Sequence, residues 1–241
     1  KRNYLYGETM THILGYVGRI NDRDVERLKK EEKFANYSGS TDMGKLGIER
    51  YYEEQLHGTT GFEEVEINNR GKVIRKLREQ PATAGKSIHL TIDLALQRYI
   101  MSLLSGQKGA VVVLDPKDNS VLAMVSTPSY DNNLFVDGIS ASDYKRLLND
   151  PARPLYSRAT QGVYPPASTV KPFVAVAALT EGVITPHTTI FDPGYWMLPN
   201  STKRFRDWKK SGHGYTDLNK AITESSDTFF YQTAFNLGID R

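Results

Sequence analysis

Residues 162–172 read Gly-Val-Tyr-Pro-Pro-Ala-Ser-Thr-Val-Lys-Pro, and an apolar run follows from Phe173 to Leu179. Proline is tolerated in the approach to a helix and in its first turn but not in its interior. We therefore predict that a buried helix begins at about Ser168, with Pro172 still in its first turn. Ser168 and Lys171 are three residues apart, so they should project from the same side of this helix.

This spacing suits a nucleophile and its base. A serine hydroxyl is a weak nucleophile until a neighbouring base takes its proton. A lysine in a desolvated pocket has its charged form disfavoured, and the neutral amine can then act as that base. The helix N-terminus adds backbone N–H groups that suit an oxyanion. Taken alone, however, Ser-x-x-Lys is more often a surface serine beside an unrelated lysine.

A second segment, residues 224–230, favours the enzymatic interpretation. It reads Glu-Ser-Ser-Asp-Thr-Phe-Phe. Ser225 can relay a proton between Lys171 and a leaving group, and Asp227 can orient a substrate. The ordinary alternative is that Ser225 or Asp227 caps the helix predicted over residues 229–237. Both roles can hold at once.

Length and composition exclude several classes of protein. The 241 residues carry a net charge of only +3, from 31 basic and 28 acidic side chains, so nothing favours a nucleic-acid partner. There is no cysteine, which excludes disulfides, a thiolate nucleophile and a cysteine-based zinc site. The longest apolar runs are much shorter than the roughly 20 residues that cross a bilayer, and no signal peptide opens the chain. We expect both ends to have been cut from a longer protein.

The first third of the chain has the pattern of a scaffold. Residues 21–24 predict the capped start of a short helix, and a second helix is predicted from Gly47 to Leu56, with Gly58 just past its end. Residues 62–74 predict a β-hairpin around a turn at 68–71. Residues 79–86 have the composition of an interdomain connection. We place the boundary there, between domains 1–84 and 85–241.

The second domain combines strands and helices. Ile88, Leu90 and Ile92 alternate as in a strand, and Asp93 can cap a helix. That helix is predicted to bury a stripe of six residues: Leu94, Leu96, Tyr99, Ile100, Leu103 and Leu104. Residues 110–116 predict a buried strand, and residues 121–126 its return partner after a turn. The pattern indicates an α+β fold with an antiparallel sheet.

The two motifs together resemble those of the class B penicillin-binding proteins. Ser-x-x-Lys, Ser-Asp-Asn and Lys-Thr-Gly form the signature of penicillin-binding proteins and class A β-lactamases. Residues 127–131, 191–194 and 206–210 are similar to the members found in rod-shaped Gram-negative bacteria, and residues 11–16 and 44–52 resemble the family's pedestal domain. The resemblance implies a dimerisation-type pedestal followed by an incomplete transpeptidase domain, an antiparallel sheet with helices on both faces as in serine β-lactamases.

The resemblance also implies roles for individual residues. Ser168 would be acylated by the terminal D-Ala-D-Ala of a peptidoglycan stem peptide, with Lys171 as base and Ser225 as relay. Asp227, where many relatives have Asn, and Thr169 would bind substrate. β-Lactams resemble D-Ala-D-Ala and would acylate the same serine. The chain has no Lys-Thr-Gly tripeptide, and its one Lys-Ser-Gly, at residues 210–212, comes before the second motif rather than after it. We expect no strand carrying the third motif in these residues, so we expect the chain to be incomplete and inactive alone.

A metal site is a separate hypothesis. Asp192, Asp207 and His213 could bind zinc, with water or a fourth side chain completing a tetrahedron. Spacing alone favours a turn aspartate, a surface ion pair and a solvated histidine. Some relatives carry zinc at the matching positions, with cysteine where this chain has Ser226, and a hydroxyl is a much weaker ligand. We expect no required cofactor, with structural zinc left open.

The resemblance implies partners and a location. A single-pass N-terminal anchor, absent from this chain, would hold the protein in the inner membrane with its catalytic domain in the periplasm. A polytopic glycan polymerase and scaffold proteins of the elongation machinery would be its partners, through the pedestal. Two alternatives stay open: a serine β-lactamase, which hydrolyses its acyl-enzyme rapidly, and a β-lactam sensor or scaffold, which does not transfer the acyl group.

Overall fold

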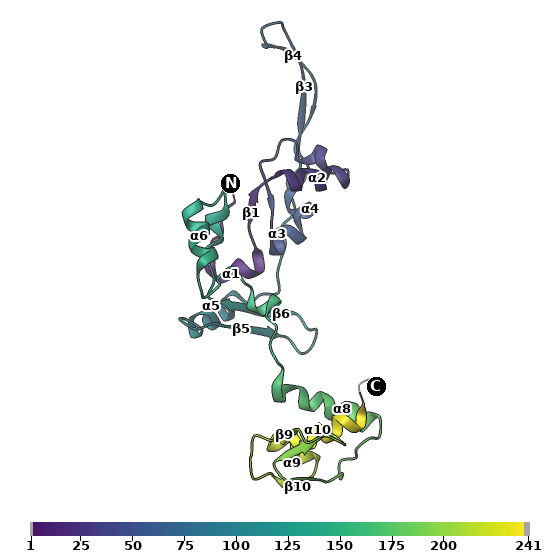
Figure 1. The fold of residues 1–241 in the computed structure, drawn as a ribbon. Coiled ribbons are helices and arrows are strands. Elements are labelled where there is room, and N and C mark those ends of the chain that lie inside the picture. The colour runs from purple at the N-terminus through teal and green to yellow at the C-terminus, as the bar shows by residue number, and fades with distance from the viewer. Residues whose placement is uncertain (1, 239–241) are drawn as a thin grey trace. The chain divides into compact units, whose positions relative to one another are not determined.

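A computed structural model of the chain describes residues 2–238. It contains two compact units, one up to Gly162 and one from Val163 onward (Figure 1). Helices and strands occur in both units, and the strand pairs of the described residues are all antiparallel. The predicted α+β class is therefore confirmed. No helix among residues 2–238 has both the length and the apolar composition needed to span a bilayer.

The first unit carries three two-stranded sheets and seven α-helices in its described residues. Its helices are α1 (Gly7–Leu14), α2 (Asp22–Lys30), α3 (Gly47–Tyr51), α4 (Glu53–His57), α5 (Leu94–Leu103), α6 (Ala141–Asn149) and α7 (Arg158–Gln161), with 3-10 turns at Phe34–Tyr37 and Asn132–Phe135. Its strands are β1 (Val17–Arg19), β2 (Asp42–Gly44), β3 (Phe62–Ile67), β4 (Val73–Gln80), β5 (Gly109–Leu114) and β6 (Val121–Thr127). They pair as β1 with β2, β3 with β4 and β5 with β6.

Local sequence signals set the predicted helix starts of this unit. Asn21 caps α2 through a capping box, in which its side chain accepts the backbone N–H of Asp24 and the Asp24 carboxylate accepts that of Asn21. The single helix predicted over residues 47–56 is instead two short ones, α3 and α4, separated at Tyr52. The Glu53 carboxylate accepts the N–H of Gly44, which ties the start of α4 to strand β2.

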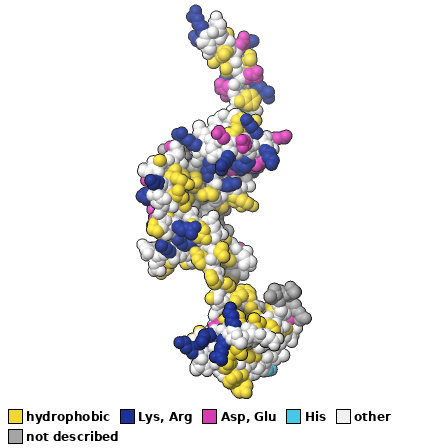
Figure 2. Space-filling model, viewed as in Figure 1, with side chains coloured by type: hydrophobic (Ala, Val, Ile, Leu, Met, Phe, Trp, Pro, Cys, Tyr) yellow, Lys and Arg dark blue, Asp and Glu magenta, His cyan; other side chains and the backbone are white. Residues whose placement is uncertain are grey.

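The predicted hairpin at residues 62–74 is confirmed as β3 and β4, which extend away from the rest of the first unit (Figure 1). The side chain of Asn68 accepts two backbone N–H groups and so closes the turn. Figure 2 shows apolar, basic and acidic side chains intermixed along this ribbon. Cross-strand ion pairs join Arg75 to Glu66 and Lys76 to Glu63. Because these pairs are exposed, they contribute little to stability.

Two predictions for the β5 region are wrong. Residues 88–92 form no strand. The hydrogen bonds described between this part of the chain and β6 are those of the Thr91 hydroxyl and of the adjacent Asp93 N–H, and they do not form a ladder. Strand β5 is not buried on both faces: Val112 is 47% exposed and Leu114 50% exposed. In the described residues β5 pairs with β6 alone, and helix α5 covers one face of this pair through Ile100.

The buried stripe predicted for α5 is also only partly correct. Tyr99 and Leu103 are exposed, whereas Gln97 is buried. The Gln97 amide donates to the carbonyls of Thr9 and Met124 and accepts the N–H of Met124. This one side chain therefore satisfies three backbone groups and connects α5 to α1 and β6.

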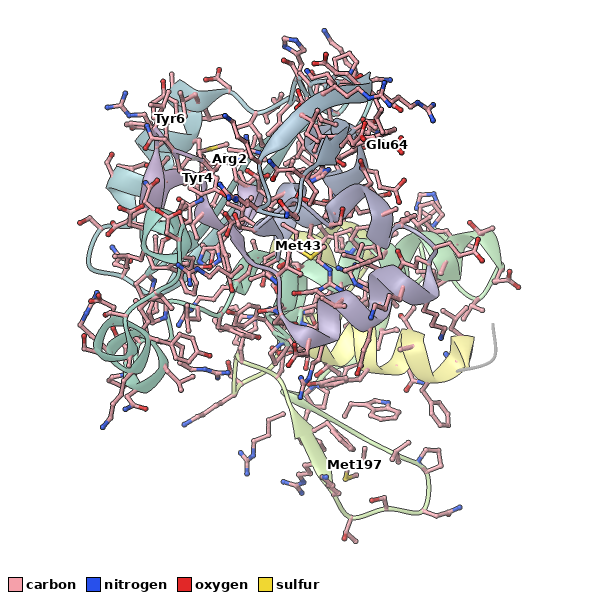
Figure 3. All side chains as sticks on the ribbon, turned by 90° about the horizontal axis from the view of Figure 1, so that it is seen from above. Arg2, Tyr4, Tyr6, Met43, Glu64 and Met197 are labelled. Carbon is pink, nitrogen blue, oxygen red and sulfur yellow. The ribbon has the colours of Figure 1, made fainter. Side chains whose placement is uncertain are left out.

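The second unit is built on three packed helices. Its helices are α8 (Lys171–Thr180), α9 (Leu218–Thr223) and α10 (Asp227–Leu237), preceded by a 3-10 turn at Ala167–Val170. Its strands are β7 (Ile190–Asp192), β8 (Tyr195–Met197), β9 (Arg204–Arg206) and β10 (Gly214–Thr216), paired as β7 with β10 and β8 with β9. Figure 3 shows Met197 on the β8–β9 hairpin. The core comprises Ala175, Ala178, Ile184, Ala221, Phe229 and Phe230.

Gln97 offers a test of the first unit. We predict that Gln97→Leu lowers the free energy of unfolding by about 2 kcal/mol or more, because three buried backbone groups lose their partner. The exposed Gln107 provides the control, and Gln107→Leu should change stability by less than about 0.5 kcal/mol. Urea denaturation followed by circular dichroism measures both. Equal effects of the two substitutions would contradict the role assigned to Gln97.

Candidate active site

The proposed nucleophile lies at the entrance to helix α8. Ser168 is within the 3-10 turn, and the α-helix begins at Lys171, three residues later than predicted. Pro172 is then close to the start of α8, where its missing N–H has no cost. Ala167, just before the nucleophile, has φ of 48°, an uncommon left-handed conformation for a residue with a side chain. Such strain is characteristic of functional loops.

Ser168, Lys171 and Ser225 form a chain of hydrogen bonds. The Ser225 hydroxyl donates to Ser168 Oγ at 3.0 Å, and Lys171 Nζ donates to Ser225 Oγ at 3.0 Å. Residues 54 and 57 positions apart are thus brought together by the packing of α8 against α10. The contacts connect Lys171 to Ser168 through Ser225, so the geometry offers a proton path through the second motif.

Lys171 is buried and fully engaged. Its ammonium donates to the Ser225 carbonyl at 2.7 Å and to Asp227 Oδ1 at 2.7 Å, besides the Ser225 hydroxyl. Three acceptors match the three N–H bonds of an ammonium group. In this arrangement Lys171 is a hydrogen-bond donor to all three groups.

The predicted substrate-binding residues have different surroundings. Asp227 is the first residue of α10, and its carboxylate is occupied by the ion pair with Lys171. The Thr169 hydroxyl donates to the carbonyl of Pro166, so it braces the 3-10 turn that carries Ser168. Their contact with substrate stays a prediction.

The three candidate metal ligands lie together beside the second motif. Asp192, Asp207 and His213 are all buried, and each offers one potential ligand atom within 4.8 Å of the others. A solvated histidine and a surface ion pair, favoured by spacing alone, are therefore wrong for this cluster. The two ring nitrogens of His213 face carboxylates, Nδ1 at 2.7 Å from Glu224 and Nε2 at 3.3 Å from Asp207. Glu224 was not among the predicted site residues, although it directly precedes the second motif.

Ser226 holds the start of α10. Its side chain accepts the N–H of Phe229, so Ser226 is the N-cap, rather than the Ser225 or Asp227 named as capping candidates. The Ser226 hydroxyl also contacts Asp192 Oδ2 at 3.0 Å and Asp207 Oδ2 at 3.3 Å. Ser225 itself has φ of 56°, which gives the turn before the helix its sharp bend.

Asp207 is a second, remote cap for the same helix. Its Oδ2 accepts the backbone N–H of Asp227 at 2.6 Å and of Thr228 at 2.9 Å. Burial alone would raise the pKa of Asp207, but these N–H donors, together with that of Lys209, hold it below its ordinary value. No sequence pattern signals this contact, because the carboxylate lies about 20 positions before the helix it caps.

Zinc is compatible with the donors of this cluster but is not needed to satisfy them. Two carboxylates and an imidazole suit zinc, with water as a fourth ligand. Without a metal, the Ser226 hydroxyl and the ring of His213 already supply hydrogen-bond donors to the two carboxylates. The side chain of Ser226 therefore serves this cluster as a proton donor, whereas a cysteine thiolate would serve as a ligand.

A serine at a helix entrance, joined through a second serine to a buried lysine, defines the class of serine acyl-transfer sites. The model for the penicillin-binding protein transpeptidase domain matches residues 109–241, and that for the penicillin-binding protein dimerisation domain matches residues 1–90. The chain therefore belongs to the penicillin-binding proteins, which confirms the family resemblance. The predicted boundary at residue 84 stays a prediction.

The chain is also similar to individual proteins of this family. The chain is 85% identical over 241 residues to peptidoglycan D,D-transpeptidase MrdA of Haemophilus influenzae, covering 100% of this chain and 37% of that protein. A crystal structure of Pseudomonas aeruginosa PBP2 in complex with WCK 5153 matches with a TM-score of 0.86 and 46% identity, over 99% of this chain and 48% of that one. A complex between PBP2 and MreC from Helicobacter pylori matches with a TM-score of 0.83 and 34% identity, over 96% and 42% of the chains.

The bridging position of Ser225 yields a prediction about acylation. Ser225→Ala should slow acylation of Ser168 by a β-lactam roughly 100-fold or more, because the connection to Lys171 is lost. Ser211→Ala, an exposed serine of the same unit, should leave the rate unchanged. Stopped-flow acylation of the full-length protein measures both. If Ser225→Ala is acylated at the parent rate, the proton path does not run through this hydroxyl.

Proposed function

We propose that the full-length protein containing this chain is a peptidoglycan D,D-transpeptidase that cross-links stem peptides during lateral elongation of the cell wall. The observation that carries the proposal is the hydrogen-bonded chain of Ser168, Ser225 and Lys171. The similarity to a named peptidoglycan D,D-transpeptidase supports it. The chain spans 37% of that relative, so the activity is assigned to the longer protein.

The reaction has two acyl-transfer steps. With Lys171 neutral, the two hydroxyl contacts reverse direction: Ser168 passes its proton to Ser225, and Ser225 passes its own to Lys171. Ser168 Oγ attacks the carbonyl carbon of the D-Ala-D-Ala bond, and the bond to the terminal D-Ala breaks as its nitrogen receives the proton through Ser225. The amino group of a neighbouring stem peptide then attacks the acyl-enzyme, loses a proton by the same path and releases Ser168.

The same chemistry makes Ser168 a target of β-lactams. Attack on the strained ring opens the amide and leaves Ser168 acylated, but the leaving nitrogen stays attached and hinders the acceptor amine. Asp227, which forms an ion pair with Lys171, is proposed to orient the substrate amide, and Thr169 to support the turn that presents the nucleophile.

We further propose that the protein is held in the inner membrane by an N-terminal single-pass anchor, with its catalytic domain in the periplasm. The resemblance to elongation enzymes supports this location. The PBP2–MreC complex from Helicobacter pylori supports a scaffold partner of that kind for the present protein. A polytopic glycan polymerase is proposed as the source of the strands to be cross-linked.

Acyl transfer as proposed uses only side chains of the protein. If zinc binds the cluster of Asp192, Asp207 and His213, its role is structural. It would hold the loops between β7 and α10 together and would take no part in the proton path. Its binding would require His213 Nε2 to give up its contact with Asp207.

The nucleophile is tested by labelling the full-length protein with a fluorescent penicillin and mapping the adduct by mass spectrometry. We expect one stable adduct on Ser168, absent from Ser168→Ala. Transfer of a D-Ala-D-Ala donor peptide to an amine acceptor should also depend on Ser168.

Each alternative function predicts a different result in these assays. An adduct that hydrolyses within seconds would indicate a serine β-lactamase. A stable adduct without transfer to any amine acceptor would indicate a β-lactam sensor. Absence of an adduct from the folded parent would exclude all three acylation functions and leave a scaffold.

A further inference from the structure

The carboxylate of Asp207 has an unusual set of contacts for a metal ligand. It is 4% exposed, and its Oδ2 is the common acceptor for the N–H groups of Asp227 and Thr228 and for the Ser226 hydroxyl. Its Oδ1 faces His213 Nε2 and accepts the N–H of Lys209. Every one of these contacts is a hydrogen bond, and three of them involve the consecutive residues Ser226, Asp227 and Thr228.

We propose that Asp207 is a positioning residue of the acylation site, acting through hydrogen bonds to the backbone of the second motif and not through a metal ion. The inference rests on the proposed acylation of Ser168. The first N–H groups of any helix lack partners within it. Here Ser226 takes that of Phe229, and Asp207 takes those of Asp227 and Thr228.

The hydrogen bonds of Asp207 bear on acylation because they lie next to Ser225, which contacts both Lys171 and Ser168. Its left-handed backbone places the hydroxyl and the carbonyl where both contact Lys171. A residue in this conformation persists only when its surroundings enforce it. The hydrogen bonds of Asp207 to the next residues along the chain supply that enforcement, and loss of them would loosen the connection between Lys171 and Ser168.

A comparison of Asp192 with Asp207 distinguishes backbone positioning from metal binding. Asp192 is equally buried, but its Oδ1 accepts the N–H of Gly194 and its Oδ2 contacts the Ser226 hydroxyl. No hydrogen bond is described between Asp192 and the backbone N–H of Asp227 or Thr228 within residues 2–238. A zinc site would need both carboxylates alike, whereas backbone positioning needs Asp207 and much less of Asp192.

The test compares Asp207→Asn, Asp207→Ala and Asp192→Asn in the full-length protein. Penicillin acylation is resolved into the dissociation constant of the initial complex and the first-order acylation rate. Zinc content is measured by plasma mass spectrometry, and acylation is repeated after treatment with EDTA. Hydrogen exchange of the amides of Asp227 and Thr228 reports on the contacts independently of activity.

We expect Asp207→Ala to slow the acylation step at least 30-fold with the dissociation constant changed less than threefold. Asp207→Asn, which keeps one acceptor oxygen, should restore part of the rate. Asp192→Asn should slow acylation less than Asp207→Asn does, whereas a zinc site would make the two effects equal, and EDTA should have no effect. Exchange of the two amides should accelerate at least tenfold in Asp207→Ala and stay unchanged in Asp192→Asn.

Three results would overturn the proposal. One is stoichiometric zinc in the parent, with acylation that is slowed by EDTA and slowed equally by Asp192→Asn and Asp207→Asn. Another is parental acylation in Asp207→Ala, and the third is unchanged amide exchange in both Asp207 variants. If Asp207→Ala does not fold, the isosteric pair of asparagine variants decides. A parent that is not acylated at all would refute the proposed function, while amide exchange would still test the contacts of Asp207.

Discussion

The second unit depends on one buried cation. Lys171 is 7% exposed, and its ammonium must find acceptors inside the protein because the loss of water around a charge is costly. All of the acceptors described for it, the carbonyl and hydroxyl of Ser225 and the Asp227 carboxylate, come from the turn that begins α10. Helix α8 and the second motif are thus coupled: neither can shift without leaving a buried charge unpaired.

Small side chains make this coupling geometrically feasible. Ala175 and Ala178 on α8 and Ala221 on α9 are buried in the core, where Phe229 and Phe230 of α10 fill the remaining space. Short side chains let the helix axes approach closely, and the two aromatic rings supply the apolar area that stabilises the packing. Phe230 also contacts the cation, because Lys171 Nζ lies over its ring, 5.8 Å from the ring centroid.

The sequence predicted structural features that depend on neighbouring residues, such as helix caps and turns. It did not predict strand pairing and burial, which depend on tertiary packing. The capping box at Asn21 and the turn at Asn68 are complete within a few residues, so residue types alone predicted them. The strand expected at residues 88–92 had the right alternation, but alternation does not supply a neighbouring strand. The burial of Gln97 was not predicted. A polar side chain is buried when backbone groups are available to hydrogen-bond it, and the partners of Gln97 lie 27 and 88 positions away in the sequence.

The same distinction applies to the candidate site. Ser168 and Lys171 could be identified from their spacing and their family resemblance, but the bridging position of Ser225 is a property of the α8–α10 contact. The contacts of Asp207 could not be predicted from the sequence. Carboxylates at turns are common, and only the fold shows which N–H groups a given carboxylate accepts.

The Ser226 hydroxyl determines how the charges of the cluster are balanced. A thiolate there would be an acceptor and an anion, and three anionic ligands with an imidazole would require a cation to hold them together. The hydroxyl is instead a donor that shares its hydrogen between Asp192 and Asp207 while its oxygen accepts the N–H of Phe229. Because His213 faces both Asp207 and Glu224, the remaining negative charge lies against a group that can carry positive charge. The cluster can therefore remain folded on hydrogen bonds alone, and the conformation of the second motif is set by the polypeptide itself.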